Sequence, residues 1–331
     1  MVCQSLITNH YSLFAIGLGR EEGIVRILIT GGAGFLGSAL ANAFVKQGHE
    51  VLALDDLSAG DPARLNRRVL FHRGSVLDRP KLWTLLQGVD CVYHLAARIL
   101  VAESNLYPRE YNEVNVGGTV ALLEAMRDVG VSRLILASSG AIYGEQAQQP
   151  VPEGACPHPQ SPYAVSKLAA EHYMNVIGDF CGISTVALRI FNAYGPDQSL
   201  PPSHAAVVPG CLRQAVGGGS LVIFGDGAQT RDFIYVDDVV AAFIAASRVE
   251  AHNHQIINVG SGIETSINDL VQLILDITGS ESNVIYSPVQ TGGLLHLCAD
   301  LTLAKHLLNY QPRVSLAEGL RRTLAQDARF R

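Results

Sequence analysis

Short apolar runs alternate with helical spacing through the first 260 residues of the chain. The apolar runs predict buried strands over residues 24–30, 51–54, 69–72, 90–97, 133–138, 183–191 and 255–259. Helical spacing is found from Leu36 through Leu40 to Phe44, over residues 106–129, and again over residues 236–247. Strands that alternate with helices in this way are typical of an α/β fold with a doubly wound parallel sheet, the Rossmann type.

The pattern becomes less regular after residue 191. A stretch rich in proline and glycine is followed by a short strand at 221–224 and by helices at 265–277, 301–308 and 316–326. We therefore predict a large domain over 24–191, to which 236–260 return, and a smaller C-terminal α/β domain made of 192–235 and 261–331. Residues 1–23 are predicted to be a flexible N-terminal extension, with an extra ordered element as the alternative.

A glycine-rich turn follows the first predicted strand, with Gly31, Gly32, Gly34 and Gly37 ahead of the helical spacing. A strand that turns through glycines into a helix leaves unpaired backbone N–H groups at the helix N-terminus, and these groups bind pyrophosphate. Glycine also lets such a ligand approach the backbone closely. The turn therefore predicts a dinucleotide site, and a purely structural turn is the alternative.

The second predicted strand ends at Asp55, which lies 18 residues beyond Gly37 (55 − 37). At this separation a carboxylate accepts hydrogen bonds from the adenosine ribose hydroxyls of a dinucleotide. Asp55 favours NAD over NADP, because it would repel a 2′-phosphate and no arginine immediately follows it. The alternative role for Asp55 is a cap at the end of the strand.

Composition and charge exclude several other functions. A net charge of −6 and a pI near 6.0 leave no basic face, so we expect no nucleic-acid partner. Six cysteines are scattered without a CxxC pair or a Cys/His cluster, which predicts free thiols, no metal site and a reducing, cytoplasmic compartment. No apolar run reaches the length of a membrane span, so no membrane partner is expected.

Residues 161–167 predict the start of a helix with Ser161 as its N-cap. Tyr163 and Lys167 then lie one turn apart on one face. An ammonium group near a phenol stabilises the phenolate and lowers the pKa of the phenol, which makes Tyr163 a general base for a hydroxyl group. Ser139, which follows a predicted strand, is expected to hydrogen-bond the same hydroxyl. An ordinary surface Tyr–Lys pair is the alternative.

A series of longer motifs carries a family resemblance. They are TGGAGFLG (30–37), DDLSAG (55–60), HLAA (94–97), NVGGT (115–119), SSGAIYG (138–144), SPYAVSK (161–167), LRIFNAYGP (188–196), FGDGAQTRDFIYVDD (224–238) and NVGSG (258–262). On these motifs the chain resembles the extended short-chain dehydrogenases/reductases of the NAD-dependent epimerase/dehydratase family. The resemblance runs from about residue 24 to residue 326, and the pattern is most similar to that of the UDP-glucose 4-epimerases.

The resemblance implies a role for most residues of these motifs. Ser139, Tyr163 and Lys167 would be catalytic. Residues implied to bind NAD are Gly31, Gly34, Phe35, Leu36, Gly37, Asp55, Asp56, Leu57, Ser58, Gly60, Ser75, Val76, Leu95, Ala96, Ala97, Ile99, Asn115, Tyr163, Lys167 and Phe191. Residues implied to bind a nucleotide sugar are Ser139, Asn192, Val222, Phe224 and Arg231. A surface ion pair with Asp232 is the alternative for Arg231.

The residues after Ser139 narrow the reaction within the family. The dehydratases it resembles place an Asp-Glu pair there and the decarboxylases a glutamate, whereas this chain has Gly140, Ala141 and Ile142, which transfer no protons. The resemblance therefore implies an NAD-dependent nucleotide-sugar 4-epimerase of the UDP-glucose/UDP-galactose type, which forms a transient 4-keto sugar. A nucleotide-sugar reductase or dehydrogenase, and a non-catalytic dinucleotide-sensing protein, are the alternatives.

Two departures from the family pattern concern binding. Ser75 stands where the family has an aspartate near the adenine amine, and Leu295 stands where it has a second arginine for the diphosphate. Either another cation such as Arg213 replaces that arginine, or the substrate is not an ordinary UDP-sugar. Leu297 is expected on the wall of the sugar pocket, where it would limit or admit a 2-acetamido group.

The resemblance also implies a homodimer, formed by two helices from each copy. The apolar residues predicted to supply its contacts are Leu122, Leu123, Met126, Ala169, Ala170 and Tyr173. The alternative place for these residues is the core of the single chain.

Overall fold

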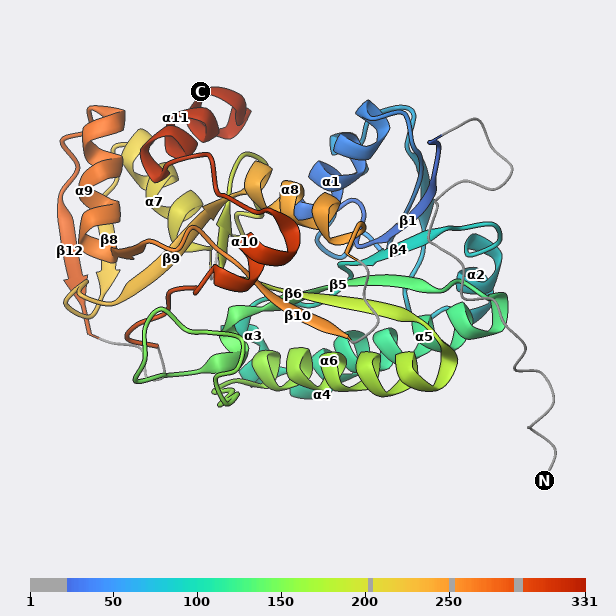
Figure 1. The fold of residues 1–331 in the computed structure, drawn as a ribbon. Coiled ribbons are helices and arrows are strands. Elements are labelled where there is room, and N and C mark those ends of the chain that lie inside the picture. Colours follow the sequence, from blue (N-terminus) through green and yellow to red (C-terminus); the bar gives the residue numbers. More distant parts are fainter. Residues whose placement is uncertain (1–22, 202–204, 250–253, 289–293) are drawn as a thin grey trace, which may run out of the picture.

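A seven-stranded parallel sheet forms the centre of the molecule in the computed structural model, which describes residues 23–201, 205–249, 254–288 and 294–331 (Figure 1). The strands are β1 (Arg26–Thr30), β2 (Glu50–Asp55), β3 (Leu70–Arg73), β4 (Cys91–His94), β5 (Arg133–Ser139), β6 (Ser184–Ile190) and β10 (Gln255–Val259). They pair in the order β10-β6-β5-β4-β1-β2-β3, and every pair is parallel. The predicted doubly wound sheet is confirmed, and its strand order reverses between β1 and β4.

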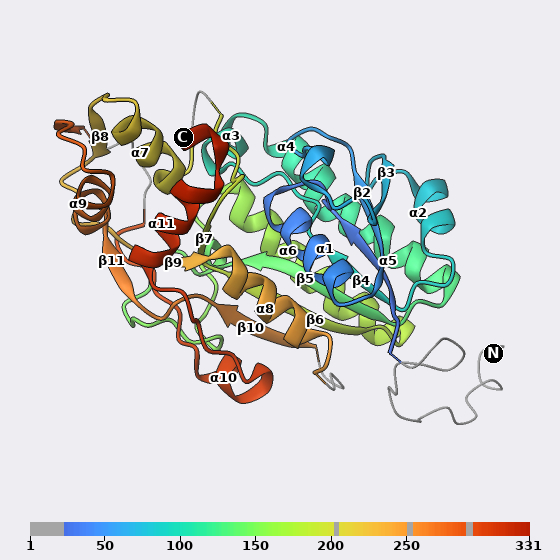
Figure 2. The same ribbon diagram turned by 90° about the horizontal axis from the view of Figure 1, so that it is seen from above.

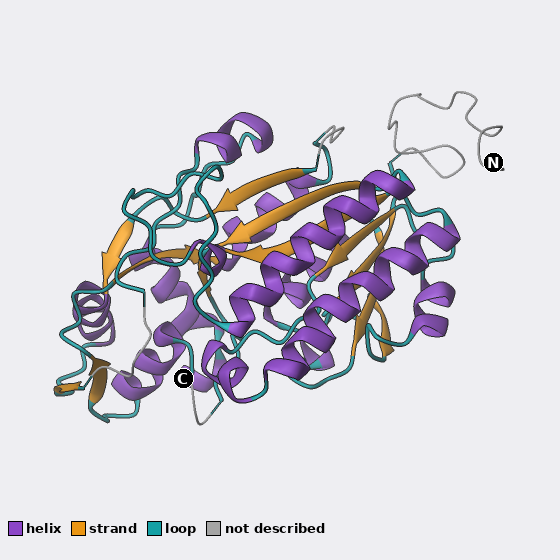
Figure 3. Ribbon diagram, turned by 90° about the horizontal axis from the view of Figure 1, so that it is seen from below, coloured by secondary structure: helices purple, strands orange, loops and turns teal. Residues whose placement is uncertain are grey.

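Helices cover both faces of this sheet (Figures 2 and 3). On one face lie α1 (Phe35–Lys46) and α8 (Val236–Ala246), and on the other lie α2 (Arg79–Leu85), α5 (Gly118–Val129) and α6 (Pro162–Cys181). Residues of β1 alternate between the two cores: Ile27 and Ile29 pack in the same core as Phe44 of α1, whereas Leu28 packs in the same core as Leu122 of α5. A strand buried on both faces needs apolar residues at successive positions, which is why β1 reads as a continuous apolar run.

A smaller group of sheets and helices lies beyond the carboxyl ends of the large sheet (Figure 1). Its strands are β7 (Asn192–Tyr194), β9 (Thr230–Tyr235) and β11 (Glu264–Ser266) in one sheet, and β8 (Leu221–Phe224) and β12 (Val284–Ser287) in another. Its helices are α7 (Val207–Val216), α9 (Ile267–Thr278) and α11 (Leu316–Gln326), whereas α10 (Thr302–Leu308) packs against β10 and α8. Short 3₁₀ helices occur at Pro62–Arg64, Gly140–Tyr143 and Ala328–Phe330.

The helix predicted over 106–129 is broken into several pieces. The segment begins with α3 (Val101–Leu106) and α4 (Pro108–Tyr111), continues as a π-helix (Asn112–Gly117), and only then enters α5. Pro108 cannot donate a backbone hydrogen bond, which separates α3 from α4. The strand predicted over 90–97 is also shorter than expected, since β4 ends at His94 and residues 95–97 leave the sheet.

Most of the residues predicted to form the homodimer contact belong to the core instead. Leu122, Leu123 and Met126 of α5 are fully buried, as is Ala170 of α6, and they pack against the large sheet. Only Tyr173 of that set is exposed on α6. The predicted N-terminal extension lies almost entirely outside the described residues.

Two features are not found in the described part of the chain. None of its helices combines the length and the apolar character that a membrane crossing requires. Within the same residues, no group of three or more His, Cys, Asp or Glu side chains is placed to hold a metal ion.

Candidate active site

A cavity of about 400 Å³ opens at the carboxyl ends of the parallel strands. The glycine turn after β1, Asp55 of β2, the loop after β4, Ser139 of β5 and Phe191 after β6 contribute to its wall. Ligands of doubly wound sheets bind at this edge, beside the reversal in strand order. Every residue predicted to bind NAD lines this cavity except Leu57 and Asn115.

The glycine turn brings the start of α1 close to the strands beneath it. Gly31 has a φ of +69°, and a Cβ there would lie 2.6 Å from the amide nitrogen of Ala96. A Cβ at Gly37 would lie 2.0 Å from the carbonyl oxygen of Gly31. The N-cap residue Gly34 offers no side-chain acceptor, and the first turn of α1 carries no acidic residue. The N–H groups in the first turn of α1 therefore have no side-chain partner. They lie at the positive end of the helix dipole, next to the cavity, as phosphate binding requires.

Asp55 caps the backbone after β1 and β2, which was its alternative role, and it also lines the cavity. Its Oδ2 accepts a hydrogen bond from the backbone N–H of Ala33 at 3.0 Å, and its Oδ1 accepts one from Leu57 at 2.8 Å. The same carboxylate lines the cavity. Burial raises the pKa of Asp55, and the backbone hydrogen bonds oppose that rise by stabilising the anion. Capping thus fixes the carboxylate in place, and its contact with a ribose stays a prediction.

The predicted catalytic residues come together in the cavity wall. Ser161 caps α6 by accepting a hydrogen bond from the N–H of Ala164 at 3.2 Å, which places Tyr163 in the first turn. Ser139 lies near the phenol of Tyr163 and lowers its pKa, and Ser139 Oγ accepts a hydrogen bond from the N–H of Ala141 at 3.2 Å. One turn along α6, Lys167 Nζ donates to the carbonyl oxygen of Ala137 at 2.9 Å. Both Tyr163 and Lys167 are buried, so the surface-pair alternative is wrong.

Burial dominates the acid–base properties of this pair. It raises the pKa of Tyr163, and the nearby Ser139 only partly opposes the rise. Burial also lowers the pKa of Lys167 to about 8, against the opposing charge of Glu171. The pKa of Tyr163 is therefore not lowered by the protein groups alone, contrary to the expected effect of Lys167. The positive charge of an oxidised nicotinamide next to the phenol would lower this pKa.

Asn115 has a structural role in place of the predicted cofactor contact. Its side chain accepts a hydrogen bond from Arg98 N at 2.8 Å and donates to Arg98 O at 3.0 Å and to Ser166 Oγ at 2.9 Å. Ser166 Oγ in turn donates to the carbonyl oxygen of Tyr163 at 2.7 Å. Asn115 thus connects the π-helix to the loop after β4 and to the start of α6, and it is not part of the cavity wall.

The predicted nucleotide-sugar residues Asn192, Val222, Phe224 and Arg231 lie outside the wall of this cavity. Val222 and Phe224 are on β8, and both side chains are exposed. Their part in substrate binding stays a prediction.

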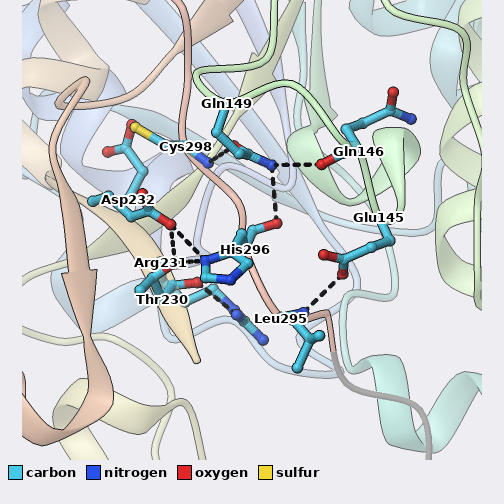
Figure 4. Close-up of polar contacts among 10 residues, drawn as sticks. Glu145, Gln146, Gln149, Thr230, Arg231, Asp232, Leu295, His296 and Cys298 are labelled. Carbon is cyan, nitrogen blue, oxygen red and sulfur yellow. Dashed lines mark hydrogen bonds and ion pairs between the residues drawn. The ribbon is translucent and has the colours of Figure 1, made fainter. Parts of the chain in front are cut away.

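Arg231 does not form the ion pair with Asp232 that was its alternative role (Figure 4). Its Nη1 donates to the carbonyl oxygen of Thr230 at 2.6 Å. The buried carboxylate of Asp232 instead accepts hydrogen bonds from the N–H groups of Ser261, Gly262 and Ala299, at 2.6, 3.0 and 3.1 Å. Among the described residues no ion pair joins Arg231 to its neighbour. Burial lowers the pKa of Arg231, and Glu145 opposes this shift.

The cavity wall contains residues for which the sequence gave no signal. Arg64, Arg98, Gln198 and Ser199 all line it. The Nη1 atom of Arg64 is buried and has no hydrogen-bond partner among the described residues. Arg64 lies in a short 3₁₀ helix of a polar loop, so neither periodicity nor motif spacing singles it out.

Comparison with known proteins decides the family. Residues 27–260 match the model of the NAD dependent epimerase/dehydratase family. The chain belongs to this family. A UDP-glucose 4-epimerase of Mycolicibacterium smegmatis is 37% identical over 307 residues, which cover 91% of this chain and 97% of that protein. These findings confirm the family that the motifs predicted and identify the chain as an NAD-dependent enzyme of the sugar-nucleotide epimerase type.

Solved structures of family members have the same fold. The UDP-glucose 4-epimerase of Thermotoga maritima, solved with UDP-glucose, has a TM-score of 0.88 and 37% identity, and the match covers 91% of this chain and 98% of that one. The UDP-glucose 4-epimerase of Thermus thermophilus, solved with NAD, has a TM-score of 0.84 and 33% identity, with 91% and 98% of the two chains covered. Other relatives bear the names of a decarboxylase and a dehydratase, so membership of the family leaves the reaction open.

The cavity suits the cofactor of this family. The N–H groups of its glycine turn would hold the pyrophosphate, and the carboxylate of Asp55 would bind the adenosine ribose. Tyr163 and Lys167 lie on α6, beside the opposite end of the cavity from Asp55, because β5 is three strands away from β2 in the sheet. NAD is the cofactor, and it would extend along the strand ends between these two groups of residues.

Proposed function

We propose that this protein is an NAD-dependent nucleotide-sugar 4-epimerase of the UDP-glucose/UDP-galactose type. The observation that supports this most directly is that Ser139, Tyr163 and Lys167 meet in the wall of one cavity, which also suits NAD. When bound, NAD accepts a hydride from C4 of the sugar and returns it to the opposite face. The nucleotide stays attached to the sugar throughout, and no external oxidant is consumed.

Three side chains handle the proton in this reaction. Tyr163 removes the proton of the C4 hydroxyl as the hydride leaves, and it returns the proton in the reverse step. Ser139 hydrogen-bonds the same oxygen and keeps it in line with the phenol. Lys167 supplies a nearby positive charge, and its hydrogen bond to Ala137 holds that charge in place.

The residues near Ser139 favour epimerisation over dehydration or decarboxylation. Both of those reactions must move a proton at a second carbon or remove a carboxylate, and relatives use acidic residues to do so. Gly140, Ala141 and Ile142 form the start of a 3₁₀ helix here and carry no titratable group. The carboxylates that do line the cavity are those of Asp55, the last residue of β2, and of Asp56, and they lie at the other end of the cavity.

A UDP-sugar is the substrate class that the comparisons support. We propose that residues 192–235 and 261–331 form the nucleotide-sugar-binding domain, in which Asn192 and Arg231 face the diphosphate and Val222 and Phe224 face the base. The exposed Leu295 adds no charge to this site. With one arginine for two phosphates, we expect weaker binding of the nucleotide sugar than in relatives with two.

We also propose a homodimer and a cytoplasmic location. Val165, Tyr173, Val176 and Phe180 form an exposed apolar stripe along one face of α6. Contiguous exposed apolar side chains of this size favour a protein partner, and two α6 helices from two copies would cover each other. The five cysteines in the described residues are free thiols, which suits a reducing compartment.

The test is turnover by the purified protein without added cofactor. Incubation with UDP-galactose should produce UDP-glucose, detected by anion-exchange chromatography, while NAD stays bound. Tyr163→Phe should lower kcat by about 10³-fold or more and retain NAD. Tyr107→Phe, an exposed tyrosine outside the cavity, is the matched control and should keep full activity. Release of free NADH would instead support a reductase or dehydrogenase, and full activity of Tyr163→Phe would contradict the proposal.

A further inference from the structure

A buried ion pair lies directly behind the tyrosine and lysine of α6. Glu171 and Arg189 are only 1% and 3% exposed. Arg189 Nε donates to Glu171 Oε1 at 3.0 Å, and Arg189 Nη2 donates to Glu171 Oε2 at 2.7 Å. Such two-point contact fixes the orientation of both side chains. Neither residue lines the cavity, and the proton steps above use neither of them.

The carboxylate of Glu171 joins three elements of the active site. Glu171 follows Tyr163 by eight residues, and the two share one face of α6 with Lys167. Ser138 Oγ, from the end of β5, donates to Glu171 Oε1 at 2.5 Å. Arg189 belongs to β6 and stands opposite Ser138 in the strand register. One carboxylate therefore holds the helix that carries Tyr163 against the strand that ends in Ser139.

Arg189 extends this connection to the segment that follows Ser139. Its guanidinium carbon lies 4.7 Å from the centre of the Tyr143 ring, in a cation–π contact. The hydroxyl of Tyr143 donates to Asn258 Oδ1 on β10 at 2.7 Å. The backbone on the far side of Ser139 is thus fixed by the same ion pair as the backbone before it.

Stability alone does not account for an ion pair at this position. Removing two charges from water costs several kcal/mol for each ion, and well-packed apolar residues often serve as well or better. The ion pair does fix the relative positions of side chains, because each hydrogen bond specifies where Ser138, Glu171 and Arg189 must lie. Fixed positions are what a serine and a tyrosine need in order to contact the same hydroxyl group.

We propose that Glu171 and Arg189 are positioning residues that set the separation and orientation of Ser139 and Tyr163. The ion pair acts through Ser138 on the end of β5 and through α6 on the phenol. It touches neither substrate nor cofactor. This inference rests on the proposed function, in which Ser139 and Tyr163 share the sugar hydroxyl.

The negative charge of Glu171 also affects the active site, through Lys167. It raises the pKa of Lys167 and so opposes the effect of burial, which lowers that pKa. The negative charge is in turn balanced by Arg189, whose pKa it raises. Two apolar side chains at these positions would preserve the packing, but they would provide neither the orienting hydrogen bonds nor the negative charge near Lys167.

Two variants of the full-length, NAD-loaded protein test the proposal. Ser138→Ala removes the link to β5 and keeps the ion pair, and Glu171→Met/Arg189→Met replaces the pair by apolar side chains. With UDP-galactose, we expect kcat to fall about tenfold in Ser138→Ala and about 100-fold in the double variant. KM, NAD content and the thermal midpoint should change little. The surface pair of Arg79 and Glu124, replaced by two methionines in the same way, is the matched control and should keep the wild-type kcat.

A second measurement needs no turnover. The Tyr163 phenolate is titrated by ultraviolet difference absorbance against Tyr163→Phe, in each background. Because Ser139 lowers the pKa of Tyr163, displacement of Ser139 in Ser138→Ala should raise that pKa by about half a unit or more. A folded Ser138→Ala variant with the wild-type kcat, or with an unchanged pKa of Tyr163, would overturn the inference. If the double variant does not fold, the result for Ser138→Ala alone decides between the two outcomes. Absence of turnover in the wild-type protein would refute the proposed function and leave the titration to judge the positioning role.

Discussion

At the scale of single residues, Lys167 combines a functional charge with an unfavourable location. Its ammonium group is buried against the carbonyl oxygen of Ala137, and burial lowers its pKa from 10.5 to about 8. Between these two values the unfolded chain binds a proton that the folded chain does not. Stability from this group therefore rises as the pH increases from about 8 to 10.5, and at neutral pH the folded protein bears the cost of the buried charge.

Lys167→Met should reveal that cost and abolish most of the activity. We expect the variant to gain stability relative to wild type at pH 7, and this gain should shrink by about 3 kcal/mol towards pH 10.5. Urea unfolding of both proteins at pH 7 and at pH 10 measures the difference. Turnover should fall at least 100-fold, because the charge next to the phenol is lost. A stability difference that does not vary with pH would contradict the buried, charged state of Lys167.

Leu295 offers a gain-of-function test at the same scale. Its side chain is 61% exposed, and its backbone N–H donates to Glu145 Oε2 at 2.8 Å, so a longer side chain fits without displacing a packed neighbour. Leu295→Arg should lower the KM for UDP-galactose about tenfold by adding a charge-assisted contact to the diphosphate. Leu295→Gln, which is polar but uncharged, is the control. Equal KM values for the two variants would place the diphosphate elsewhere.

At the scale of elements, the contact between the glycine turn and α1 leaves no room for side chains. Gly37→Ala would place a methyl group 2.0 Å from the carbonyl oxygen of Gly31, so the turn must shift. We expect NAD affinity to fall at least tenfold and the free energy of unfolding to decrease by about 2 kcal/mol or more. Gly154→Ala, where a Cβ meets nothing within 4 Å, is the control. Calorimetry with NAD and urea unfolding provide the two measurements.

The elements that the sequence predicted well are those whose burial follows from the pattern of a few consecutive residues. Strands such as β5 are apolar on both faces, and the 163–167 spacing places Tyr163 and Lys167 on one face of α6 whatever surrounds them. β9 was not predicted because it contains the charged Asp232, whose hydrogen-bond partners, the N–H and hydroxyl groups of Ser261 and the N–H of Ala299, are far away in the sequence. Helix α7 escaped because Pro209 and Gly210 interrupt its pattern.

In the candidate site, too, the residues that could be predicted are those that local spacing identifies. Ser139, Tyr163 and the glycine turn follow from local spacing, and the structure brings them to one cavity. Asn115 was assigned to the cofactor by its motif, but its amide hydrogen bonds are used within the protein. The contacts of Glu171 depend on β5 and β6 lying side by side. No window around residue 171 contains that information, because the partners are 33 and 18 residues away.

At the scale of the whole molecule, the outer face of α6 is the feature that single-chain packing leaves unexplained. Phe180 is 87% exposed and Val176 is 54% exposed, one turn apart on the same face of the helix. Leu122, Leu123, Met126 and Ala170, four of the residues first expected to form the dimer, are instead packed in the core. Exposed aromatic and branched side chains in a row are unfavourable in water, and a symmetric contact between two copies removes the whole row at once.

Val176→Glu/Phe180→Glu should therefore convert a dimer to a monomer. Two carboxylates from each copy would meet their symmetry mates in a contact with low water content, where like charges repel strongly. Light scattering coupled to size-exclusion chromatography should show the mass of two chains for wild type and of one chain for the variant. Val216→Glu, an exposed apolar position on α7, is the control for added charge and should stay dimeric. A monomeric wild-type protein would show that the stripe has another partner, and a dimeric variant would place the contact on another face.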